Sequence, residues 1–463
     1  MNDNKSPFVK TAWVLIILFV GGLTVLQAIP DEVDSSGNTE DSTGLVIAQL
    51  QAEFILAQGV MSGSSEAAST GAIVLDAGTV AQRQRYIAFM IGLGDLEAAK
   101  LSALRMQAEL ASENMELSQQ QAKTQEMLNI LVKGGELPED HESLEDSLGW
   151  FGSFVEADVA ERKKIENSVV TKVTIVMVAV LVVAIAAIIG LVFLIIKAVK
   201  AFDGKIKSGL ASPSTHHGVY AEVFALWLFT FVGLTILAGM LSKVVANGSA
   251  TIELCLVLSA FFGSLVVLFW GRVRGVPFEQ IREDIGWTTG NGVIREIFTG
   301  FAGYAMTLPI LGIGILITLL LFVIQQLLSG GAEASQFQST GGGAHPIVVD
   351  IAKGVWATKI LLIFMAAVVA PVVEETIFRG VLYRHLRSSF KFRAALSIIC
   401  SVLLVSFVFA AIHPQGWIAI PALMGIAVGM NLLREWRGSL IPSMVVHGVS
   451  NGIVVSMMVL MLS

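Results

Sequence analysis

The chain has 463 residues, of which 54% are hydrophobic and only 14% are charged. A soluble globular protein of this length has no use for so much apolar sequence, whereas an integral membrane protein requires it. The two cysteines, Cys255 and Cys400, lie in apolar runs, which argues against a disulfide framework or a thiolate metal site. The net charge of −7 is unevenly spread in a way that fits membrane topology and argues against nucleic-acid binding.

Apolar spans alternate with polar connections along most of the chain. A helix needs about 20 mainly apolar residues to cross the hydrocarbon core of a membrane, and most of these spans are long enough. We therefore predict an all-α polytopic membrane protein of about nine transmembrane helices, with an N-terminal anchor ahead of an eight-helix core. The predicted spans are 11–29, 169–196, 219–242, 252–271, 297–325, 351–383, 394–413, 416–433 and 439–462.

The chain divides into four regions. Residues 1–30 are predicted to be a transmembrane anchor, although their basic start and apolar centre would also suit a cleaved signal peptide. Residues 31–168 hold 24 acidic and 9 basic residues and show helical periodicity, so we predict an acidic, mainly helical extramembrane region. Residues 169–349 would supply the first helices of the core, and residues 350–463 would form a second transmembrane domain.

The extramembrane region opens with a linker rich in Ser, Asp and Gly over residues 31–44. Further along, the apolar run 86–94 ends in glycine, and Asp95 directly precedes a second helical pattern. This arrangement predicts two helices joined at the glycine, with Asp95 as the N-cap of the second helix. Helical periodicity specifies no function, so the region is interpreted as a helical hairpin domain or coiled segment that could bind a protein partner.

Basic residues fix the predicted orientation. Lysines precede the first span, and further Lys and Arg clusters follow spans two, four, six and eight. All of these clusters fall on one side if the N-terminus is cytoplasmic, because basic residues gather in cytoplasmic loops. Only the cluster at 162–164 disagrees. The predicted location is a bacterial plasma membrane, with residues 31–168 extracytoplasmic.

Ionisable residues inside a membrane span are energetically expensive and point to function. Only two carboxylates, Glu374 and Glu375, lie well inside an apolar span, and only two histidines, His413 and His447, lie in or at the end of one. All four lie in the last 90 residues of the chain, where two further polar side chains, Arg379 and Asn451, also lie.

The spacing within this set separates the roles of the two glutamates. Glu375 and Arg379 are four residues apart, so they can pair on one helix face. Glu374 is then the less compensated carboxylate, which suits a general base. Taken singly, a Glu–Arg pair, a lone histidine or a lone asparagine would be interpreted as structural. Six costly residues in three spans require a shared explanation.

Three motifs in order carry a resemblance to a known family. They are Glu374-Glu-Thr-Ile-Phe-Arg379, Phe409-Ala-Ala-Ile-His413 and His447-Gly-Val-Ser-Asn451. As E-E-x-x-x-R, F-x-x-x-H and H-x-x-x-N, they resemble the CPBP family of intramembrane proteases, which includes type II CAAX prenyl endopeptidases and proteins of bacteriocin processing and self-immunity. The resemblance covers roughly residues 350–455 and does not extend to 31–168.

The resemblance implies a role for each residue. Glu374 and His413 would activate the attacking water, and His447 and Asn451 would donate hydrogen bonds to the oxyanion. Glu375, Arg379 and Phe409 would support them. The resemblance leaves two mechanisms open: a metal-free glutamate mechanism, or a zinc site on Glu374, His413 and His447, although no H-E-x-x-H pair is present.

The predicted function is an intramembrane endopeptidase whose substrates are membrane proteins or lipidated peptides, CAAX-like or other. The alternatives are a proton-coupled transporter, against which the lack of an inverted repeat argues, or a non-catalytic membrane scaffold. The predicted topology contains one difficulty. His413 falls near the outer end of its span, whereas Glu374 and His447 lie about nine residues, or ~13 Å, from the cytoplasmic end. The three come together only if the span that leads to His413 tilts or starts below the membrane surface, which a helix continuing past Tyr383 to about residue 388 would allow.

Overall fold

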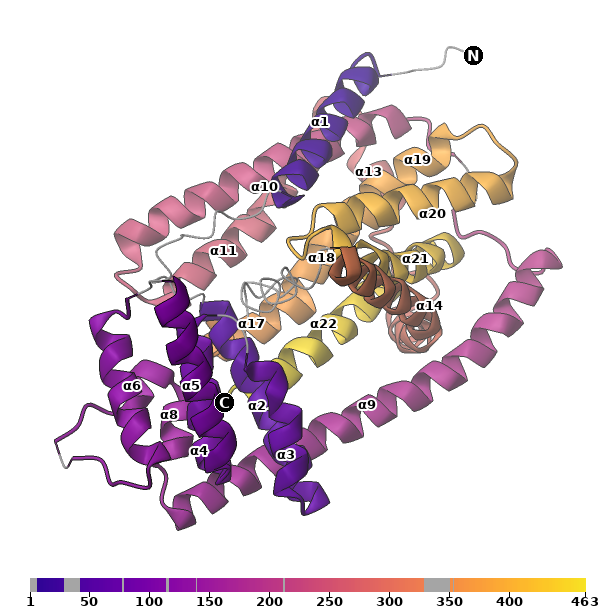
Figure 1. The fold of residues 1–463 in the computed structure, drawn as a ribbon. Coiled ribbons are helices and arrows are strands. Elements are labelled where there is room, and N and C mark those ends of the chain that lie inside the picture. The colour runs from indigo at the N-terminus through magenta and orange to yellow at the C-terminus, as the bar shows by residue number, and fades with distance from the viewer. Residues whose placement is uncertain are drawn as a thin grey trace. The chain divides into compact units, whose positions relative to one another are not determined.

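The computed structural model describes residues 6–28, 42–76, 79–113, 116–138, 140–210, 213–328, 350–352 and 354–463. Within these ranges the chain forms helices and connecting turns without a strand, which confirms the all-α prediction (Figure 1). Most of the predicted linker, residues 31–41, lies outside the described residues.

Ten helices in the described ranges are long and apolar enough to cross a membrane. Nine of them coincide with the predicted spans. The protein is therefore an integral membrane protein. The tenth, Gly44–Ser62, belongs to the acidic region and is less apolar than the rest. Several of its side chains, including Ala52, Leu56 and Ala57, are buried in a helical core, so its apolar residues also serve ordinary packing.

The chain forms two compact units. One unit comprises residues 31–180, 326–352 and 460–463, and the other comprises residues 1–30, 181–325 and 353–459. The long helix α9 (Val159–Phe202) begins in the first of these units and ends in the second. The predicted boundary at residue 168 therefore falls inside a continuous helix.

The acidic unit is a cluster of short helices around an aromatic core. Trp150 stacks on Phe154 with ring centroids 5.2 Å apart, and Phe89 contacts both rings. The predicted hairpin is present, because Gly94 ends α4 with a φ of 83° and Asp95 accepts a hydrogen bond from the Ala98 N–H at 3.1 Å. The helices of the acidic unit are α2 (Ser42–Ser62), α3 (Ser65–Ala72), α4 (Val80–Leu93), α5 (Leu96–Glu113), α6 (Gln119–Val132), α7 (Leu144–Leu148) and α8 (Trp150–Glu156).

The other unit contains the nine predicted spans, one of them the second half of α9. Neighbours in it include α20 with α21 and α1 with α10, as Figure 1 also shows. The short amphipathic helix α13 (Phe278–Ile285) lies where the sequence has mixed charge between two spans. The bounds of the other helices are α1 (Val9–Ala28), α10 (His217–Val245), α11 (Ala250–Ser264), α12 (Phe269–Val273), α14 (Val293–Leu328), α20 (Ala394–Ala411), α21 (Ile420–Arg437) and α22 (Ile441–Met461).

One helical span of this unit changes its winding twice. Residues Trp356–Ser389 form a single span made of α17 (Trp356–Phe364), the π-helical segment η3 (Met365–Val369), α18 (Ala370–Glu375), the π-helical segment η4 (Thr376–Leu382) and α19 (Tyr383–Ser389). π-Helical turns are rare and are found mainly at functional sites, because they leave backbone groups without regular partners. The two glutamates stand between these turns.

Candidate active site

Glu374 lies between two imidazole rings from different helices. Its Oε2 atom is 3.9 Å from Nε2 of His413, which follows α20, and 3.9 Å from Nε2 of His447 on α22. The three side chains are largely buried, with 17% of Glu374, 20% of His413 and 5% of His447 exposed. Three residues separated by up to 73 positions in sequence thus converge on one point.

The second ring nitrogen of each histidine is held by a different partner. Nδ1 of His413 lies 2.6 Å from the Phe409 carbonyl oxygen, which can only accept, so Nδ1 donates. Nδ1 of His447 lies 2.9 Å from Oε1 of Glu375. If Nδ1–H also donates there, both Nε2 atoms turn lone pairs toward Glu374. The Glu374 Oε2 atom itself is buried and has no hydrogen-bond partner within the described part of the chain.

Glu375 and Arg379 form the ion pair that their spacing predicts. The Arg379 guanidinium donates to Oε1 of Glu375 at 3.0 Å, and both side chains are fully buried. The same Glu375 oxygen contacts Nδ1 of His447. Glu375 therefore joins the arginine to the histidine, and Glu374 is left outside the pair, as predicted.

Phe409 is the aromatic centre of the site. Its ring centroid lies 4.3 Å from the His413 ring and 5.9 Å from the His447 ring, and the Arg379 guanidinium carbon lies 4.4 Å from it. The ring thus packs against both histidines and forms a cation–π contact with the arginine. The backbone carbonyl of the same residue orients His413, so Phe409 contributes both its ring and its main chain.

Asn451 reaches the neighbouring π-helical turn. Its Nδ2 amide donates to the Ala366 carbonyl of η3 at 3.2 Å. An amide has two N–H groups, so one donor remains available for another acceptor. The contact ties α22 to the helix that carries the glutamates.

The difficulty in the predicted topology is resolved by helix length. The helix that carries Glu374 continues through α19 to Ser389, and α20 begins only at Ala394. The span that leads to His413 therefore starts a whole α-helical segment beyond the predicted end of the preceding span. The chain therefore turns back farther from Glu374 before α20 begins, and the end of α20 places His413 close to Glu374.

Comparisons with known proteins find similarity in the region of the chain that holds this site. A family model described as type II CAAX prenyl endopeptidase Rce1-like matches residues 356–453. Residues 356–453 thus resemble the Rce1-like domain of the CPBP family. The membrane-embedded CAAX protease MroQ of Staphylococcus aureus (strain USA300) is 28% identical over 95 residues, which cover 20% of this chain and 38% of that relative. No solved structure matches the chain.

Two residues that support the site, Arg434 and Trp287, were missed by sequence reasoning. In the sequence, Arg434 contributes only to the basic cluster that follows span eight. In the structure it is fully buried and donates to the backbone carbonyls of Arg379 and Asp284 at 3.1 and 2.8 Å. Trp287 donates its indole N–H to Thr376 Oγ1 at 2.9 Å. These contacts hold η4 from the α13 side, and because both residues are distant from the E-E-x-x-x-R motif in sequence, no local signal indicated them.

α22 approaches the π-helical turn η3 most closely at Gly448. A Cβ atom at this position would lie 2.4 Å from the Ala367 carbonyl oxygen, closer than real Cβ contacts allow. Glycine is therefore required for the close approach that sets His447 beside Glu375.

We expect Gly448→Ala to lower activity about 100-fold, because a displacement near 1 Å of a catalytic group costs about that factor. The control is Gly239→Ala on α10, where an added Cβ meets no atom within 4 Å. That variant should keep its activity and gain up to about 1 kcal/mol of stability from better helix propensity. Thermal unfolding and turnover of both variants check the expectation, and equal activity of the two would contradict it.

A zinc site in this region would take Glu374, His413 and His447 as its protein ligands. Carboxylate and imidazole groups suit zinc chemically, but tetrahedral bonds of about 2.0–2.1 Å hold the ligand atoms about 3.3 Å apart. The spacing here is 3.9 Å on both sides of Glu374. Among the described residues, no group of three or more His, Cys, Asp or Glu side chains is arranged to hold a metal ion. The arrangement does not fit zinc.

Proposed function

We propose that this protein is an intramembrane endopeptidase that hydrolyses peptide bonds of membrane-associated protein substrates. One observation carries the proposal: Oε2 of Glu374 lies 3.9 Å from Nε2 of both His413 and His447. This spacing is too long for direct hydrogen bonds and short enough for one shared water molecule. A water that donates one hydrogen to Glu374 and the other to the Nε2 lone pair of His413 is a suitable nucleophile for hydrolysis.

In the proposed reaction, Glu374 removes a proton from this water, and the hydroxide oxygen attacks the carbonyl carbon of the substrate. His413 orients the water through its Nε2 lone pair. The carbonyl π electrons move onto oxygen, and the free N–H of Asn451 donates to the resulting oxyanion. His447 would donate there as well through Nε2 in the form that carries hydrogens on both ring nitrogens, with Nδ1–H held by Glu375. Collapse breaks the C–N bond, and the proton on Glu374 passes to the leaving amine.

No metal takes part in the proposed mechanism. We expect purified protein to contain substoichiometric zinc and to keep its activity after dialysis against a zinc chelator. Metal analysis paired with an activity assay checks this, and the control is readdition of zinc to the chelated protein. Loss of activity that zinc restores would contradict the metal-free mechanism without removing the peptidase assignment.

The function is tested in proteoliposomes with a membrane-tethered peptide that carries a label at each end. Cleavage should release a single fragment, and mass spectrometry identifies the bond that is broken. The transporter alternative predicts a pH-driven flux and no cleavage, and the scaffold alternative predicts neither. Substrates are proposed as CAAX-like or other membrane-tethered proteins, and a panel with and without a lipidated C-terminus distinguishes them.

We further propose a bacterial plasma membrane location with the N-terminus cytoplasmic and residues 31–168 extracytoplasmic, where they would recruit a protein partner. The basic clusters that follow the spans support this orientation. In a variant without the native cysteines, Glu136→Cys on an exposed turn of the acidic unit should react from outside with a membrane-impermeant maleimide. Labelling only after the membrane is permeabilised would show that the orientation is the opposite of the one proposed.

A further inference from the structure

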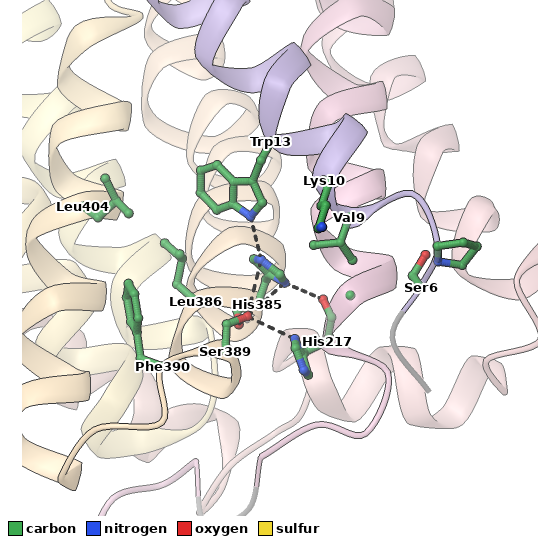
Figure 2. Close-up of a pocket in the computed structure, with 12 residues that line it drawn as sticks. Ser6, Val9, Lys10, Trp13, His217, His385, Leu386, Ser389, Phe390 and Leu404 are labelled. Atoms are coloured by element: carbon green, nitrogen blue, oxygen red, sulfur yellow. Dashed lines mark hydrogen bonds between the residues drawn. The ribbon is translucent and has the colours of Figure 1, made fainter. Parts of the chain in front are cut away.

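A second cavity lies apart from the glutamate site. It has a volume of about 640 Å³ and is bordered by α1, the start of α10, α19 and α20 (Figure 2). His385 lies on its wall, eleven residues beyond Glu374 along the same helical span, which corresponds to roughly 16 Å of helix. The cavity therefore belongs to neither the two glutamates nor the two catalytic histidines.

The polar wall of this cavity is held by internal hydrogen bonds. Figure 2 shows the Trp13 indole N–H donating to Nε2 of His385 at 3.1 Å. Nδ1–H of His385 donates to the backbone carbonyl of His217 at 2.7 Å, and the Ser389 hydroxyl lies 3.0 Å from Nδ1 of His217. These contacts join α1 to α10 and α19 and fix the shape of the cavity.

The rest of the lining combines apolar side chains with one cation. Val9, Leu386, Phe390 and Leu404 line the cavity, and no Asp or Glu is among the described residues around it. Lys10 is exposed, and no ion pair is formed by its ammonium group within the described part of the chain. An apolar cavity with an unneutralised ammonium group at its edge is complementary to an amphiphile with a negative head.

We propose that this cavity binds one anionic phospholipid, with an acyl chain against Phe390 and Leu404 and the phosphate on Lys10. Three features favour a lipid over a soluble ligand: the apolar lining, the tryptophan beside the cation, and the position of both residues at the start of a predicted span. The volume lies within the range of about 300–1,000 Å³ that is usual for ligand sites.

The test is native mass spectrometry of the full-length protein with phosphatidylglycerol or phosphatidylcholine. One phosphatidylglycerol should bind preferentially, and Lys10→Gln should weaken it about five-fold, the usual contribution of one lysine near an anionic headgroup. Phosphatidylcholine binding should not change. Lys200→Gln, which alters an exposed lysine at the end of α9, is the matched charge control.

A second pair of variants tests the cavity itself. Leu404→Trp fills the space where the chain would lie and should abolish the preferential adduct, whereas Leu403→Trp on the exposed side of α20 should leave it intact. Equal lipid binding by wild type, Lys10→Gln and Leu404→Trp would overturn the proposal. Displacement of the lipid by millimolar inorganic phosphate would assign the site to a free phosphate and overturn the lipid as its ligand.

Discussion

Glu374→Gln should lower peptide-bond hydrolysis by on the order of 10²–10⁴-fold, the usual contribution of a general base. The amide keeps the size of the carboxylate but cannot accept the proton of the attacking water. The folded state should not suffer, because Oε2 of Glu374 is buried without a hydrogen-bond partner among the described residues, and an amide there can still bond to a water shared with His413 or His447. The melting temperature should therefore stay equal or rise.

The measurement is a single-turnover assay in proteoliposomes together with thermal unfolding. Glu253→Gln is the matched control, since Glu253 is an exposed glutamate in the first turn of α11, another membrane-spanning helix. Full activity of Glu374→Gln would contradict the mechanism. Equal losses in both variants would indicate damage to the membrane domain and not the removal of a base.

Much of the site could be predicted from spacing alone. The pairing of Glu375 with Arg379 follows from positions four apart on a helix, and the pair forms even though the segment between them is π-helical. The N-cap role of Asp95 follows from the glycine directly ahead of it, which ends an apolar run, and from the helical pattern after it. Such features depend on neighbours in sequence, so local chemistry determines them.

Other features depend on contacts between distant segments and could not be predicted. The π-helical turns η3 and η4 are stabilised by tertiary contacts, among them the donation from Arg434 to the Arg379 carbonyl. The close approach at Gly448 depends on which residue of η3 faces α22. The helix α2 combines the composition of a membrane span with burial in the acidic unit, and composition cannot separate the two roles.

The second large effect concerns the buried ion pair. Arg379→Met should destabilise the protein by about 3–5 kcal/mol, because it leaves the fully buried Glu375 carboxylate without its countercharge. The double variant Glu375→Gln with Arg379→Met should recover most of that loss, since no uncompensated charge remains. As the control, Lys205→Met removes one partner of the exposed pair with Asp203 and should cost less than about 1 kcal/mol.

Activity separates the two roles of this pair. In the double variant, the amide oxygen introduced by Glu375→Gln can still accept from Nδ1–H of His447, so the ring keeps its orientation. A neutral amide is a weaker acceptor for Nδ1–H of His447 than the Glu375 carboxylate, so turnover should stay well below wild type although stability returns. Full recovery of both stability and turnover would mean that the pair only supports the fold. Because Glu375 contacts both Arg379 and His447, we expect stability to recover without turnover.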